Sequence, residues 1–146
     1  MKQYKQFAAI AVMSYLAINP ARSETLAIGP TKCFSSIEEL LNAEINKNGV
    51  KINNFNMERG NSLFSRNMKS FHFSASGVNR TDKDVHLDIQ LVGYRQNNDF
   101  AFIIVAKPMM SILSAGKNEE ISGDSFEGNN PVTELSKVCI RVIGDF

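Results

Sequence analysis

The sequence predicts an α+β fold in which a curved antiparallel β-sheet of four to six strands packs on an N-terminal amphipathic helix as a two-layer sandwich. Three observations predict it. One amphipathic helical segment begins the mature chain, several segments of alternating polar and apolar residues follow it, and the connections have the length and composition of hairpin turns. The composition is that of a globular protein, with 43% hydrophobic and 21% charged residues among 146.

Residues 1–23 have the three regions of a secretory signal peptide. Two lysines begin the segment, residues 7–18 form an apolar core, and Ala21 and Ser23 place small residues where a signal peptidase cuts. A membrane span needs about 20 apolar residues, so this core is too short to be an uncleaved anchor. We therefore expect a mature chain of one domain over residues 24–146, without a transmembrane span, in the periplasm or secreted.

The two cysteines, Cys33 and Cys139, lie near the two ends of that mature chain. Export places them in an oxidising compartment, where two thiols are expected to pair. We predict a disulfide between them that closes the domain. The sequence contains no Cys-x-x-Cys motif, which argues against a redox site.

The strongest helix signal covers residues 35–47. Ser35 and Glu38 have the spacing of a capping box, and Asn48-Gly49 is a typical helix end. The apolar residues that recur at helical spacing and would face the sheet are Ile37, Leu40, Leu41 and Ile45.

Strands are predicted after this helix, at residues 50–57, 68–75, 84–94, 100–106 and 138–143. Turn residues at 77–83 and 96–99 connect neighbouring strands, so the second and third are expected to form a hairpin. The order of one helix followed by antiparallel strands is similar to that of cystatin-like folds, and no motif in the chain ties it to a family.

Two further segments have no strand alternation. Residues 109–115 fit either a helical turn or a short strand. Residues 116–130 are rich in Gly, Asn, Ser and acidic side chains, and they are predicted to form a long exposed loop.

The only two histidines of the chain fall on the polar sides of the predicted hairpin strands. Pairing across the turn at 77–83 sets His72 opposite Asp88 and Ser74 opposite His86, within side-chain reach. The candidate surface site consists of His72, His86, Asp84, Asp88 and Ser74. Three interpretations are open: a metal site, a hydrolytic site with one histidine as base, or a solvated sheet face. We favour the last, because a one-sided sheet carries such residues by default.

The composition also bounds the function. A formal charge of +1 and the absence of tryptophan argue against nucleic-acid binding, and no motif implies a cofactor. Asn79-Arg80-Thr81 matches an N-glycosylation sequon. The phenylalanines are interpreted as core residues, with a ligand pocket as the alternative.

The sequence therefore predicts a small exported, non-enzymatic interaction protein of the bacterial periplasm, whose partner is another protein. Its expected contact surfaces are the polar sheet face around the histidines and the loop at 116–130. One alternative is a secreted hydrolase or metal-binding protein that uses His72 and His86. Another is a carrier that holds a small apolar ligand between helix and sheet. The oligomeric state stays open.

Overall fold

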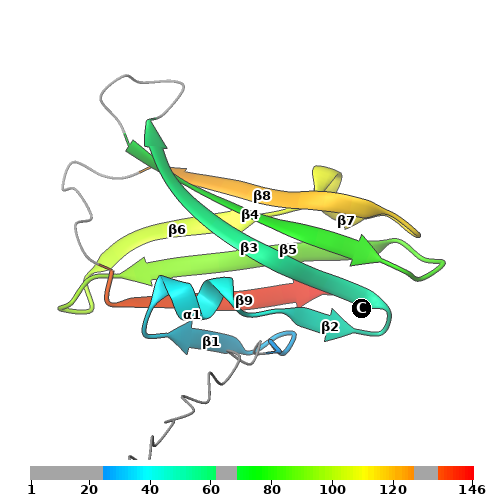
Figure 1. Ribbon diagram of the computed structural model, residues 1–146, viewed down its shortest axis with the longest axis horizontal. Coiled ribbons are helices and arrows are strands. Elements are labelled where there is room, and N and C mark those ends of the chain that lie inside the picture. Colours follow the sequence, from blue (N-terminus) through cyan, green and yellow to red (C-terminus); the bar gives the residue numbers. More distant parts are fainter. Residues whose placement is uncertain (1–24, 62–68, 127–134) are drawn as a thin grey trace, which may run out of the picture.

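The computed structural model describes residues 25–61, 69–126 and 135–146, which form antiparallel β-sheets with one short α-helix (Figure 1). The predicted signal peptide lies outside these residues. No helix in the described ranges is long and apolar enough to span a membrane. The elements in chain order are β1 (Thr31–Phe34), α1 (Ile37–Leu41), β2 (Ile45–Lys47), β3 (Val50–Asn61), β4 (Lys69–Asn79), β5 (Val85–Tyr94), β6 (Phe100–Ala106), the 3-10 turn η1 (Met109–Ser111), β7 (Ile112–Leu113), β8 (Asn118–Phe126) and β9 (Lys137–Gly144).

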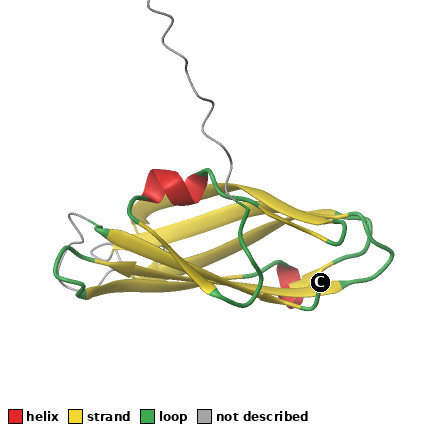
Figure 2. Cartoon of the chain, turned by 90° about the horizontal axis from the view of Figure 1, so that it is seen from below, coloured by secondary structure: helices red, strands yellow, loops and turns green. Residues whose placement is uncertain are grey.

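The strands form two sheets instead of the predicted one. The first has the order β1-β9-β5-β6, with β7 paired to the start of β5, and the second has the order β2-β3-β4-β8. Figure 2 shows these strands in two layers. The antiparallel pairing is confirmed, but a single sheet covered by a helix is wrong, because the second sheet takes the place expected for the helix.

The helix α1 is only five residues long, where residues 35–47 were predicted. Its N-cap is Ser36, whose hydroxyl accepts a hydrogen bond from the backbone N–H of Glu39 at 3.2 Å. The amide side chain of Asn42 donates to the Glu38 carbonyl at 2.9 Å and ends the helix. Ile45 is fully buried as the first residue of β2, so its helical spacing was coincidental.

The predicted alternation of the strands is confirmed, and it places the core between the two sheets. Phe71 and Phe73 of β4 are buried, as are the alternate residues of β5 from Val85 to Leu91. The Phe71 ring lies 4.8 Å from the Phe102 ring of β6, which joins the two sheets. Each such side chain contributes about 1.5–3 kcal/mol through burial.

The two sheets meet directly where β6 passes β8. Lys107, just after β6, and Ser122 of β8 exchange two backbone hydrogen bonds, at 3.0 and 3.1 Å. Gly123 allows this approach, since a Cβ there would lie 2.5 Å from the Val105 carbonyl oxygen. The loop predicted at 116–130 is therefore wrong over residues 118–126, which form β8; residues 127–130 lie outside the described part.

The predicted Cys33–Cys139 disulfide is present. The two cysteines are directly paired residues of β1 and β9, with Cα atoms 3.9 Å apart. Cys139 points to the side of β9 opposite Val138 and Ile140, so the bridge lies on the outer side of its sheet, where Cys139 is only 7% exposed. Since 106 residues separate the cysteines, the chain-entropy model assigns this bridge about 4–5 kcal/mol.

The link from β4 to β5 is not a hairpin turn, because it carries the chain from one sheet to the other. Asn79 organises this crossing and is 1% exposed. Its side-chain nitrogen donates to the carbonyls of Lys83, at 2.7 Å, and Leu113, at 3.0 Å. Its side-chain oxygen accepts from the backbone N–H and the hydroxyl of Thr81, at 2.9 and 2.7 Å. The folded chain therefore has no room for a glycan at this sequon.

Replacement of this amide tests its role. We expect Asn79→Ala to lower the free energy of unfolding by about 2–4 kcal/mol, because it leaves the Leu113 carbonyl and the Thr81 N–H without their side-chain partner and removes one of the two donors to the Lys83 carbonyl. Urea titration of the oxidised chain measures the loss. Asn46→Ala, at an exposed position of β2, is the matched control and should change stability by less than about 0.5 kcal/mol. Equal stability of both variants would contradict the role of Asn79.

Candidate functional site

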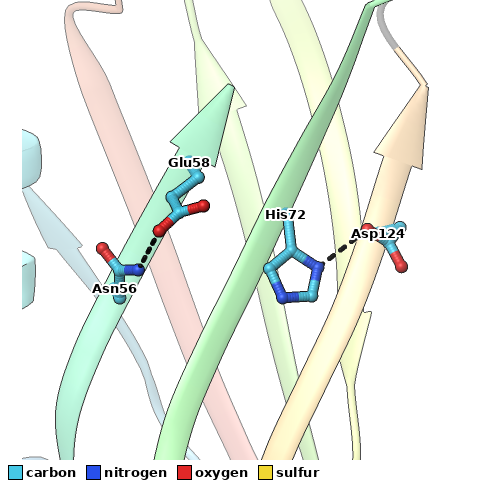
Figure 3. A network of polar contacts seen from close by, with 4 residues as sticks. All are labelled: Asn56, Glu58, His72 and Asp124. Atoms are coloured by element: carbon cyan, nitrogen blue, oxygen red, sulfur yellow. Dashed lines mark hydrogen bonds and ion pairs between the residues drawn. The ribbon is translucent and has the colours of Figure 1, made fainter. Parts of the chain in front are cut away.

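The outer side of the β2-β3-β4-β8 sheet is a polar face. On β4 it presents the serines and the histidine that alternate with the buried residues, as predicted. The register places Glu58 of β3 and Asp124 of β8 on either side of His72. Figure 3 shows these three side chains on neighbouring strands, with Asn56 beside Glu58. We call this set of four residues the His72 row.

Direct contacts order the His72 row. The Nδ1 atom of His72 lies 2.9 Å from Oδ1 of Asp124, and the side-chain nitrogen of Asn56 donates to Oε1 of Glu58 at 2.9 Å. His72 and Asp124 are exposed to solvent, so their contact stabilises the fold by at most about 1 kcal/mol. Among the described residues, His72 has no hydrogen bond to a serine hydroxyl, so the His72 row does not contain the serine–histidine pair of a serine hydrolase.

The other predicted site residues do not join the His72 row. Ser74 lies on the same face, opposite Asn56 and Ser122, but His86 belongs to β5 in the other sheet and pairs with Ile112 of β7. The predicted pairing of β4 with β5 is therefore wrong, because the link between them changes sheets.

Of the two predicted aspartates, Asp84 directly precedes β5 and Asp88 belongs to it, and each has a partner of its own. Asp84 accepts a hydrogen bond from the Ala115 N–H at 2.8 Å, and Asp88 lies 3.7 Å from Nζ of Lys107. The structure thus divides the candidate surface site between two sheets.

A depression of about 340 Å³ lies at the other end of the polar face. It forms beside an irregularity of β3 between Asn53 and Asn56, where Asn54 adopts a positive φ of 54°. Ser74, Ser76 and Glu120 line it together with Asn54. Its polar side chains offer hydrogen bonds to a ligand, but no buried charge or apolar wall fixes the orientation of one.

The outer side of the β1-β9-β5-β6 sheet is polar near the start of β5, where it carries His86, Asp88 and Gln90, and apolar toward the connection from β5 to β6. The register aligns the disulfide, Val92 and Ile103 in one row across all four strands. Ile103 and Val105 point outward from β6 and are 51% and 41% exposed, and Phe100 at its start is 58% exposed. We call this surface the apolar face; its residues are Cys139, Val92, Tyr94, Phe100, Ile103 and Val105.

Basic residues border the apolar face. The charged residues of β9 that share its outward side are Lys137 and Arg141. Nζ of Lys137 lies 4.8 Å from the centre of the Tyr94 ring, and the Arg141 guanidinium donates to the Gly29 carbonyl at 2.8 Å. A contiguous apolar surface with a charged rim is typical of protein–protein contacts.

The sequence reasoning missed three of the four residues in the His72 row and the whole apolar face. Asp124 was assigned to the loop at 116–130, since only Ile121 marks the buried side of β8 with a large apolar residue. A nearly continuous apolar run such as that of β6 is typical of a strand covered on both sides or of a central strand. An exposed apolar strand has the same sequence pattern, so the pattern alone does not distinguish the two.

Comparisons of this chain with protein-family models, with curated proteins and with solved structures found no match. Its function is therefore inferred from its own surfaces.

A zinc titration tests the metal-site alternative. Among the residues with described positions, no group of three or more His, Cys, Asp or Glu side chains is placed to share a metal, and zinc sites use at least three protein ligands. We expect no heat of binding when millimolar zinc is titrated into the oxidised chain in a calorimeter. Micromolar zinc binding that His72→Ala abolishes would contradict this expectation.

Proposed function

We propose that this chain is an exported, non-enzymatic interaction protein of the bacterial periplasm that binds a protein partner through its apolar face. The observation that carries the proposal is the contrast between the two outer surfaces. One sheet presents serine, asparagine and charged residues to solvent, whereas β6 presents Ile103 and Val105. Solvent-facing strands are normally polar, so a contiguous apolar stretch indicates a surface that a partner covers.

The disulfide supports the proposed location. Structural disulfides form and persist in oxidising compartments such as the periplasm, and the bridge here joins two strands near the ends of the described chain. The pattern of residues 1–23 supports the same route.

The arrangement of polar residues supports binding over catalysis. The two histidines belong to different sheets, so they do not act on one substrate atom as acid and base. The core also disfavours the carrier alternative, since Phe55 and Phe73, with ring centres 5.6 Å apart, and the Phe71–Phe102 pair occupy the space between the sheets.

Site-specific photo-crosslinking tests the proposal. A photoreactive amino acid replaces Ile103 on the apolar face, and in a separate variant it replaces Ser74 on the polar face as the matched control. Both variants are expressed in the native host and irradiated in intact cells. We expect the Ile103 variant to form one discrete protein adduct and the Ser74 variant to form none, because only the first residue lies inside the contact surface.

Thermal unfolding should show that both variants fold like the unmodified chain. The absence of a protein adduct at Ile103, or an identical set of adducts at both positions, would overturn the proposed function.

A further inference from the structure

Two methionines stand out from the protein at η1, directly after the end of β6. Met109 is 84% exposed and Met110 is 76% exposed. Met110 and Ser111 have φ angles of 57° and 60°, a conformation that costs non-glycine residues of order 1 kcal/mol each. The flanks hold this geometry, since the Ser111 N–H donates to the Pro108 carbonyl at 2.9 Å and β7 pairs with β5. The fold thus holds the backbone of this turn in place and leaves both methionine side chains in contact with solvent.

A groove of about 560 Å³ lies beside these methionines. Met109, Met110 and Ile112 provide its apolar wall, and three carboxylate side chains complete it. Its acidic lining residues are Asp84, Glu119 and Glu120, and no basic side chain lines it. We call the two methionines and this groove the methionine turn. An apolar surface with an acidic border fits a partner whose apolar surface has a basic border.

The apolar face of the same protein is such a surface, since Lys137 and Arg141 border it. The acidic groove of the methionine turn and the Tyr94 end of the apolar face lie at opposite ends of β5. Asp84 directly precedes β5, and Tyr94, whose ring lies beside Lys137, ends it, so ten residues separate these two borders by about 30 Å. Ile103 and Val105 lie between them on β6, which ends shortly before Met109. Figure 1 shows β7 near one end of the molecule and the connection from β5 to β6 at the other. One molecule therefore does not bring its own acidic groove to the Lys137 border of its apolar face.

We propose that this chain associates head to tail with further copies of itself, with the methionine turn of one copy docked on the apolar face of the next. The inference rests on the proposed function and names its partner. Methionine side chains adapt to an apolar surface of almost any shape, and the opposite charges of the two borders select the orientation. In this arrangement each copy uses its two surfaces on two different neighbours, so the contact is heterologous, and it builds rings or filaments instead of a closed two-fold dimer.

Complementation between two variants tests this arrangement. The first variant, Met109→Ser with Met110→Ser, loses the methionine turn but keeps the apolar face. The second, Ile103→Thr with Val105→Thr, loses the apolar face but keeps the methionine turn. All four positions are exposed, so the fold should survive, and thermal unfolding checks this. A third variant, Ser74→Thr with Ser122→Thr on the polar face, is the matched control.

Sedimentation velocity of the mature, oxidised chain measures the association. We expect the wild type and the polar-face control to form species larger than dimers as concentration rises. Each of the first two variants alone should need at least about tenfold higher concentration to associate, as expected when a central contact is lost. An equimolar mixture of these two variants should form a 1:1 dimer and stop there, because it contains one intact pair of surfaces.

Three results would overturn the inference: a wild-type chain that stays monomeric up to its solubility limit, a wild-type chain that stops at a dimer, or a mixture of the two variants that does not associate. These failures are separable from a failure of the proposed function. If the chain does not self-associate but Ile103 crosslinks to a different protein, the head-to-tail inference fails and the interaction function stands. If the Ile103 adduct is a second copy crosslinked near Met109, both stand.

Discussion

The side chain of Asn79 fixes the point at which the chain passes from one sheet to the other. An asparagine with two donor hydrogens and an oxygen acceptor satisfies two carbonyls and a local turn at once, which a buried position requires. Because the crossing occurs here, the strands on either side of it are not neighbours. As a result, the outward residues of β4 and β5 lie on different sheets: His72 points outward from one sheet and His86 from the other.

Much of the fold was predictable from local patterns, but its connectivity was not. Alternation in β4 and β5 correctly predicted the buried side of each strand, and the expectation that the chain is exported correctly predicted that its two cysteines pair. The strand that pairs with β4 depends on whether residues 80–84 form a hairpin turn within one sheet or a crossing to the other sheet. Both kinds of connection are rich in the same polar residues, so the sequence does not distinguish them. The helix was overestimated since Ile45 continues a helical spacing from within a strand. The candidate surface site was wrong for the same reason, because it assumed that β4 and β5 pair as a hairpin.

The two outer surfaces of the protein differ in the residues that they expose to water. The His72 row is ordered but exposed, and water screens its charges, so it contributes little to stability. The apolar face leaves about half of each of the Ile103, Val105 and Phe100 side chains in contact with water. The disulfide lies beneath the same face and ties β1 to β9 there, so the covalent bridge stiffens the surface proposed to bind.

Cross-strand nuclear Overhauser effects in the isotope-labelled, oxidised chain test the central claim, that β4 and β5 belong to different sheets. The structure predicts backbone contacts between Ser74 and Ser122, from β4 to β8, and between Val92 and Cys139, from β5 to β9. Backbone contacts between Ser74 and His86 would contradict it, because they would restore the hairpin and place both histidines on one surface.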